Sequence, residues 1–420
     1  MTKTCLLYIL SELRAENIVI SRESRAVNRW RVLFSQDYAN LLQEIKPVQE
    51  SLKMNKDMKS SKLFFASDYM EGAHPMILQR LMETNLLHTA GYGTDEFSES
   101  ARAKIREACE APDADVYFLV GGTQANATVI RSILRPYQGV IAAETGHVST
   151  HEAGAIEAGG HKVITLPHKN GKLDAASIER CIQGYWDDDN HDHMVMPGLV
   201  YISQPTEFGT LYSLDELTKI SDTCHRYNVP LYVDGARLAY ALACPQNDVT
   251  LPDLARLCDA FYIGGTKCGA LFGEAVVLPQ HDFIPHFFTL IKQNGALLAK
   301  GRIAGIQFET LFSEVPAAAR RSLDGAAAAD APLLYEAIGR NAIDAADRIR
   351  AALIDKGYEI SFECPTNQLF ITVDDTQKER LEALLELSFW EKLPDGRTVL
   401  RICTSWATDS SDVDKLIEIL

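Results

Sequence analysis

The stretch YIGGTKCGAL, residues 262–271, places one lysine, Lys267, in a turn of small residues directly after an apolar run. The residues before it, LCDAFY, predict the end of a helix that leads into a buried strand. A lysine in a confined site can lose its proton and attack a carbonyl carbon to form a Schiff base. The pattern therefore indicates a chemical role for Lys267 at the end of a strand.

Seven apolar runs of this kind occupy the middle of the chain. They alternate with helical patterns, for which Thr123 and Ser213 are the predicted N-caps. This alternation predicts an α/β fold with a mainly parallel seven-stranded sheet and helices on both faces. The runs are VYFLVGG, GVIAAE, HKVITLP, GLVYISQ, VPLYVDGA, DAFYIGG and GEAVVL.

The pattern changes near residue 317. A long helical region, rich in alanine and charged residues, runs to Lys356, and the strand-like segments YEISFE, QLFITV and TVLRICTSW follow with helices. We therefore expect a large domain over residues 63–317 and a small C-terminal α+β domain over residues 318–420.

Residues 1–62 show no chemistry, and they end in a polar, lysine-rich segment. They are interpreted as an N-terminal extension that is partly ordered, or as a product of a start codon assigned too early. In the second interpretation, Met54 or Met58 is the true start.

The composition excludes several classes of partner. The formal net charge of −16 argues against nucleic acid and against an anionic membrane surface. No apolar run is long enough to span a bilayer, and no signal peptide is recognised. Nine cysteines without a Cys-x-x-Cys pair indicate free thiols and a cytoplasmic location. The acidic insert around His191 and His193 lacks regular ligand spacing and is interpreted as a solvated loop, so no metal site is expected.

Polar groups follow four of the predicted strands, and ligands bind at the carboxyl ends of strands in open α/β sheets. Taken singly they are weak signals, because glycines often only make turns and a lone histidine is often structural. Together they match pyridoxal phosphate, which needs an amine, an anion seat, an acid at its ring nitrogen and a flat group over its ring. Lys267, the Gly122–Thr123 turn, Asp234 and His147 supply these in turn. No nicotinamide or ATP site needs all four.

From Phe65 onward, the chain resembles the low-specificity L-threonine aldolases of the beta-eliminating lyase family. These are fold type I pyridoxal-phosphate enzymes of the aspartate aminotransferase superfamily. The matching motifs are FASDYMEGAHP, AGYGTDEFS, VGGTQAN, ETGH, VDGARL, GGTKCG, KGRIAG and VLRICTSW.

The resemblance implies roles for further residues. Ser67, Arg237 and Arg401 match groups that hold the substrate carboxylate. Tyr92 matches the tyrosine of a family loop that reaches the site of a neighbouring subunit, and Arg302 matches an arginine that approaches the cofactor phosphate across a subunit boundary. A homodimer or homotetramer with shared active sites is therefore expected.

Three positions depart from the family pattern. The segment SQPTEFG has Glu207 where the family often has a histidine that faces the substrate hydroxyl. Thr266 replaces the usual serine before the lysine, and Gly121 replaces the serine before the phosphate glycine. These changes leave the cofactor site complete but alter the pocket for the substrate side chain.

The implied reaction is retro-aldol cleavage of a β-hydroxy-α-amino acid, of threonine or allo-threonine type, to glycine and an aldehyde. The base that removes the hydroxyl proton is His147, His88 or a water near the phosphate. Beside Lys267, Cys268 is interpreted as a small apolar filler. Two alternatives stay open: a β-eliminating lyase that acts on another amino acid, and a non-catalytic binding protein on the same fold.

Overall fold

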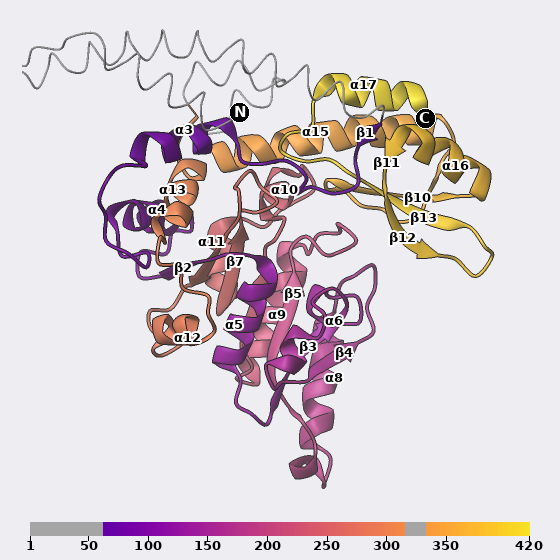
Figure 1. Ribbon diagram of the computed structural model, residues 1–420. Coiled ribbons are helices and arrows are strands. Elements are labelled where there is room, and N and C mark those ends of the chain that lie inside the picture. Colours follow the sequence, from indigo (N-terminus) through magenta and orange to yellow (C-terminus); the bar gives the residue numbers. More distant parts are fainter. Residues whose placement is uncertain (1–61, 316–332) are drawn as a thin grey trace, which may run out of the picture. The chain divides into compact units, whose positions relative to one another are not determined.

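The computed structural model describes residues 62–315 and 333–420 (Figure 1). The predicted N-terminal extension, up to residue 61, and the predicted domain boundary at residue 317 lie outside these residues. Residues Lys62–Leu420 form one compact unit. In the parts of the chain that are described, no helix is long and apolar enough to cross a membrane.

The large sheet confirms all seven predicted strands. Its order is β2-β8-β7-β6-β5-β3-β4, and β8 is antiparallel to both neighbours while every other adjacent pair is parallel. The carboxyl ends of six strands and the beginning of β8 therefore share one edge. The strands are β2 (Asp115–Leu119), β3 (Gln138–Ala143), β4 (Val163–Leu166), β5 (Met196–Ser203), β6 (Leu231–Asp234), β7 (Ala260–Gly264) and β8 (Glu274–Leu278).

Both faces of this sheet are buried, which explains why its strands read as continuous apolar runs. On β5, Leu199 and Tyr201 pack into one core cluster, whereas Val200 and Ile202 pack into the other. The first cluster includes side chains of α5 (Gly122–Ile133), α7 (Ala155–Ala158) and α12 (Phe287–Gln293). The second includes those of α4 (Glu96–Ala108), α8 (Ala175–Trp186), α9 (Leu214–Arg226), α10 (Leu238–Ala243), α11 (Leu251–Leu257) and α13 (Arg302–Leu311).

The two predicted N-caps have different outcomes. Ser213 caps α9 in a reciprocal capping box with Glu216, as predicted. The prediction of Thr123 as an N-cap is wrong, because α5 begins at Gly122 and its N-cap is Gly121. Since glycine has no side chain to accept a hydrogen bond, no side chain caps this helix.

The C-terminal part contains an antiparallel sheet of order β12-β13-β10-β9. The helix α15 (Leu334–Asp355) places Ile338 in the core of the large sheet, and Ile349 in a separate cluster with residues of the small sheet. This part contains β9 (Glu359–Ile360), β10 (Gln368–Val373), α16 (Asp375–Leu384), β12 (Ser388–Lys392), β13 (Thr398–Cys403), α17 (Ser410–Ile419) and β11 (Leu385–Glu386), which pairs in parallel with β1 (Leu63–Phe64).

The insert after α8 forms the short 3-10 helix His191–His193. Within the described ranges, no group of three or more His, Cys, Asp or Glu side chains is arranged to hold a metal ion. Every cysteine in those ranges has a free thiol. Cys268 lies fully buried in the larger apolar cluster, and burial raises the pKa of its thiol to about 12, so it packs as an apolar residue.

Candidate active site

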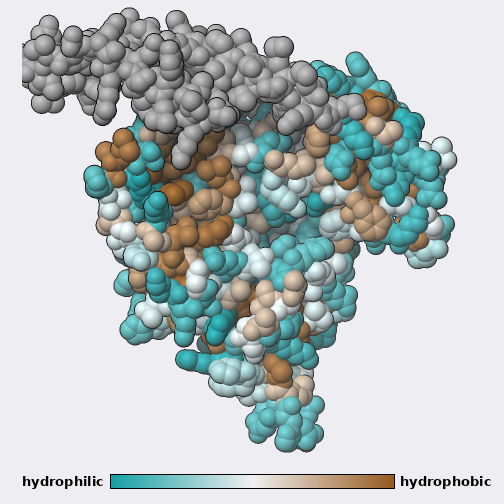
Figure 2. Space-filling model, in the orientation of Figure 1, coloured by the Kyte–Doolittle hydropathy of each residue, from teal (hydrophilic) through white to brown (hydrophobic). Residues whose placement is uncertain are grey.

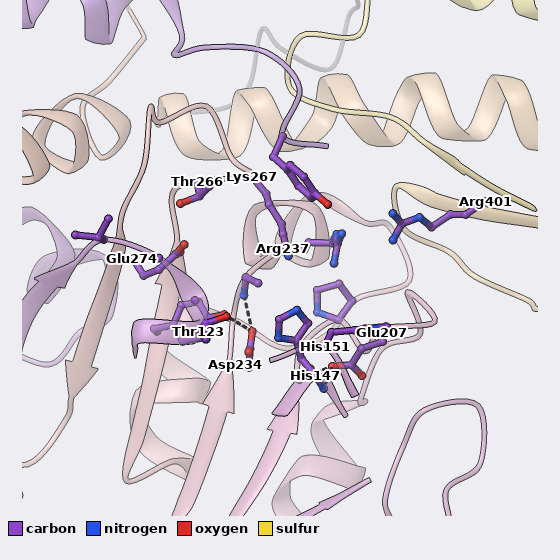
Figure 3. A pocket seen from close by; sticks show the side chains of 18 of the residues that line it. Thr123, His147, His151, Glu207, Asp234, Arg237, Thr266, Lys267, Glu274 and Arg401 are labelled. Carbon is purple, nitrogen blue, oxygen red and sulfur yellow. Dashed lines mark hydrogen bonds between the residues drawn. The ribbon is translucent and has the colours of Figure 1, made fainter. Parts of the chain in front are cut away.

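A cavity of about 640 Å³ opens at the edge where the parallel strands end (Figure 3). Residues that are far apart in the sequence meet here because the turns that follow β2, β3, β6 and β7 all lie at this edge. This strand-end cavity brings together seven of the predicted site residues: Gly122, Thr123, His147, Asp234, Arg237, Lys267 and Arg401.

Asp234 ends β6 as a buried carboxylate with four hydrogen-bond donors around it. Its Oδ2 accepts from the Tyr201 hydroxyl at 2.6 Å and from Asn126 Nδ2 at 3.0 Å. Its Oδ1 accepts from the Tyr262 hydroxyl at 2.5 Å and from the backbone N–H of Ala236 at 3.0 Å. Burial by itself would raise the pKa of Asp234, but the interaction with His147 and these hydrogen bonds lower it. The carboxylate is therefore kept charged in the cavity wall.

A hydrogen-bonded chain connects this aspartate to His147, which begins α6 (His147–Thr150) after β3. The His147 Nδ1 lies 2.7 Å from Oε1 of the buried Glu152, and the same oxygen accepts from Asn126 Nδ2 at 2.7 Å. Asn126 in turn donates to Asp234. Because Glu152 holds Nδ1, the ring plane of His147 is fixed and its Nε2 is directed away from Glu152.

The N-terminus of α5 has the features of an anion-binding site. Backbone N–H groups in the first turn of a helix lack partners and favour negative charge. Here no side chain caps the helix, and Gly121, Gly122 and Thr123 line the strand-end cavity. A Cβ atom built on Gly121 would meet no atom within 4 Å, so space for a ligand lies directly beside these groups.

Lys267 lies in the cavity near both a cationic side chain, Arg237, and acidic side chains (Figure 3). Burial and the nearby Arg237 lower the pKa of its amine, while Asp68, Asp234 and Glu274 oppose this shift. A lowered pKa increases the fraction of neutral, nucleophilic amine. The cavity also contains Glu274, at the start of β8, where burial raises the pKa to about 8.

The two predicted carboxylate-binding arginines differ in their surroundings. Arg237 forms a bidentate pair with the buried Asp68, at 2.6 Å and 3.0 Å, so its charge is already compensated. Arg401 has no acidic partner among the described hydrogen bonds and ion pairs. Its Nη atoms donate to Gln368 Oε1, Ser388 Oγ and a backbone carbonyl, and its Nε is buried without a partner in the described residues. Of the two arginines, Arg401 is therefore the one whose charge is open to an anionic ligand.

Four predicted residues do not line the strand-end cavity of their own chain: Ser67, His88, Tyr92 and Arg302. Ser67 is buried, and Tyr69 lines the cavity instead. His88 and Tyr92 are exposed. The Arg302 guanidinium donates to the carbonyls of residues 84, 85 and 87, where it caps the end of α3 (Pro75–Thr84).

Sequence reasoning missed several side chains that also line the cavity, among them His151, Glu274 and Trp390. Glu207, the departure from the family pattern, does lie there. Its Oε1 accepts from the His147 backbone N–H at 2.9 Å and from Ser203 Oγ at 2.8 Å, and burial raises its pKa. This position has thus become part of the support for His147.

A family model described as Beta-eliminating lyase matches residues 65–356. The chain belongs to the beta-eliminating lyase family. A low specificity L-threonine aldolase from Pseudomonas sp. strain NCIMB 10558 is 31% identical over 358 residues, which cover 84% of this chain and 95% of that protein. The solved structure of a threonine aldolase from Leishmania major is 42% identical with a TM-score of 0.78, and covers 85% of this chain and 98% of that one. A mutant aspartate aminotransferase from Thermus thermophilus, 14% identical with a TM-score of 0.61 over 89% of this chain and 94% of that one, shows the shared fold.

These comparisons confirm the resemblance and the fold predicted from the motifs. As a beta-eliminating lyase family member, the chain is a pyridoxal-phosphate-dependent lyase. Its own residues fit that cofactor. The uncapped helix N-terminus suits the phosphate, the charged Asp234 suits the ring nitrogen, and Lys267 supplies the amine.

Proposed function

We propose that this protein cleaves a β-hydroxy-α-amino acid of threonine or allo-threonine type to glycine and an aldehyde. The observation that carries the proposal is the meeting of Lys267, Asp234, His147 and Arg401 around one cavity. Relatives described as threonine aldolases, 31% and 42% identical over most of the chain, support it.

Each side chain has a defined part in this reaction. Bound pyridoxal phosphate supplies an aldehyde that condenses with amines and a ring that accepts electrons from the α-carbon. Arg401 holds the substrate carboxylate by charge-assisted hydrogen bonds. Lys267 would hold the cofactor through its amine when no amino acid is bound. Asp234, kept ionised by its donors, holds a proton on the ring nitrogen.

The side chains around the cavity also orient the reacting groups and keep bulk water away from the substrate. Bidentate pairing with Asp68 holds Arg237 in place beside Lys267, whose pKa burial and the Arg237 charge both lower. The ring of Trp390 lies 5.8 Å from the Arg401 guanidinium carbon and covers that side of the cavity. A substrate held there is shielded from bulk water on the aromatic side.

The test is a product assay on a panel of amino acids. Threonine, allo-threonine and phenylserine are expected to release glycine and an aldehyde, detected by reduction with an NADH-linked alcohol dehydrogenase. β-Substituted alanines such as O-acetylserine test the alternative, β-elimination, which would release pyruvate. Pyruvate without aldehyde would overturn the proposal, and the absence of either product with cofactor bound would indicate a binding protein.

We also propose a homo-oligomer, a dimer or tetramer, in the cytoplasm. An apolar surface gathers over the region of α3 and α13 (Figure 2). Large apolar side chains are exposed on α3 and just after it: Leu78, Met82, Leu86 and Leu87. A patch of this kind favours a protein partner, and a second copy would bring its Tyr92 and Arg302, which lie near this region, to the partner's cavity.

A further inference from the structure

The strand-end cavity contains two imidazole rings, although the motifs pointed to only one. His151 follows α6 directly, and its backbone N–H donates to the His147 carbonyl at 2.9 Å. One turn therefore separates the two residues, and it brings their ring centroids to 5.9 Å at an interplanar angle of 65°. In Figure 3, the His151 ring lies between His147 and Arg401.

The other groups in this wall are already engaged. Glu152 holds Nδ1 of His147, and the family resemblance assigns the face of that ring to the cofactor. The Glu207 Oε1 accepts two donors, a backbone N–H and Ser203 Oγ. By contrast, no hydrogen bond or ion pair to the His151 ring nitrogens occurs among the residues the structure describes. Within the described ranges, the His151 ring contacts the rings of His147 and, at 6.5 Å, Trp390. Its nitrogens are free to bind a substrate.

The way in which the proposed function holds the substrate places the substrate side chain near His151. With the carboxylate on Arg401 and the amine at Lys267, two substituents of the α-carbon are fixed. Of the two positions left on the α-carbon, we assign the side chain to the one beside the wall that contains His147, His151 and Glu207 (Figure 3). Of the two imidazoles in this wall, His151 has both ring nitrogens without a hydrogen bond in the described residues, whereas His147 has its Nδ1 held by Glu152.

The electrostatics of this wall favour the neutral form of the His151 ring. Burial lowers its pKa, and so do the nearby charges of His147, Arg401 and Lys267. Glu207 is the acidic group in the same wall, and burial raises its pKa. An imidazole that is neutral at pH 7 can accept a proton.

We propose that His151 is a catalytic residue, whose ring accepts the β-hydroxyl proton of the amino acid during cleavage. As the O–H bond breaks, its electron pair forms the carbonyl bond of the aldehyde. The Cα–Cβ bond breaks, and its pair stays with the α-carbon, which later takes up a proton and leaves as glycine. The proton on His151 returns to solvent, so no oxidant or reductant is needed. This role compensates for the family histidine that Glu207 replaces, and it rests on the proposed function.

The experiment compares His151→Asn and His151→Phe with the parent holoenzyme. We expect a 10²- to 10³-fold loss in kcat for threonine cleavage, the size typical of a general base. Exchange of the glycine α-proton with deuterium, which involves no hydroxyl group, should change less than about threefold. His193→Phe, in the exposed insert, is the matched control and should behave as the parent does.

A readout independent of activity is the rate at which diethyl pyrocarbonate modifies each histidine, mapped by mass spectrometry across pH. His151 should react as a neutral imidazole below pH 6.5, its ordinary pKa, and the acidic limb of kcat/KM should follow the same titration.

The outcomes separate the two proposals. If the parent releases no aldehyde from threonine, the proposed function fails. If the parent cleaves threonine and His151→Asn retains more than about a third of that rate, His151 is not the base. Loss of glycine exchange together with cleavage would show that the ring only positions the cofactor, which also overturns the inference. Cofactor absorbance and circular dichroism verify that each variant folds, and if the Phe variant does not fold, the Asn variant decides.

Discussion

The side-chain nitrogen of Asn126 lies 3.0 Å from the Asp234 carboxylate, and it also donates to Glu152 at 2.7 Å. One amide group thus joins the acid expected at the cofactor ring nitrogen to the acid that fixes His147. The Asn126 oxygen accepts from the Tyr232 hydroxyl at 2.9 Å, so the whole amide is engaged inside the protein. Removing it would leave three buried polar groups short of a partner.

We predict that Asn126→Ala lowers both stability and cofactor affinity. The Tyr232 hydroxyl would lose its described partner, whereas Asp234 and Glu152 keep other partners. An unpaired buried group costs about 1–3 kcal/mol, so the unfolding free energy should fall by that amount. Since Asp234 loses one of the donors that lower its pKa, pyridoxal phosphate should also bind several-fold more weakly. Urea unfolding of the apoprotein and a cofactor titration followed by absorbance measure the two effects. Asn190→Ala, at an exposed site in the insert after α8, is the control. Unchanged affinity would show that the Asn126 link is only structural.

Lys267→Ala should remove the covalent attachment of the cofactor and reduce turnover by at least about 10³-fold, because no other amine lines the strand-end cavity in the described chain. The parent should purify yellow, and borohydride should fix the cofactor to the Lys267 peptide. Lys219→Ala, on the surface, should keep both properties. A reduced adduct on a different lysine would contradict the assignment.

The sequence predicted the strands of the large sheet because buried parallel strands are apolar on both faces. It did not reveal β12, whose residues SFWEK mix polar and apolar side chains at the edge of a small sheet. It also placed the start of α5 wrongly, because glycine is a weaker N-cap signal than the threonine two residues on.

The candidate site was predictable where a polar residue follows an apolar run, as at Asp234 and Lys267. Glu274 was missed because it begins β8, and the antiparallel direction that brings it to the same edge cannot be read from the run itself. His151 was missed because it lies one helical turn beyond the ETGH motif, where only the three-dimensional path shows which way it faces.

The His74 ring gives a prediction for the pH dependence of stability. Its Nδ1 accepts the Met76 N–H at the start of α3, and burial lowers its pKa from 6.5 to about 4. The folded state therefore binds fewer protons than the unfolded state between these values. The stability that the neutral ring contributes is complete above pH 6.5 and is lost as the pH falls towards 4.

Replacing this residue by His74→Asn keeps an N-cap acceptor but removes the titration. Between pH 7 and 4, the parent should lose roughly 2–3 kcal/mol more unfolding free energy than the variant. Denaturant unfolding at a series of pH values measures the difference. Parallel curves for the two proteins would show that His74 is protonated in the folded state as readily as in the unfolded chain.

Subunit complementation tests whether sites are shared between chains. Lys267→Ala and Tyr92→Ala should each be nearly inactive alone, because one lacks the amine and the other the residue expected to act in the partner's site. After subunits are mixed and exchanged, half of the dimers are hybrids and each has one intact site, so about a quarter of the parent activity should return. Arg302→Ala should complement in the same way, with unfolding as a check, because Arg302 also caps α3 in its own chain. No recovery in hybrids whose exchange is shown by mass spectrometry, or a fully active monomer in light scattering, would contradict the shared site.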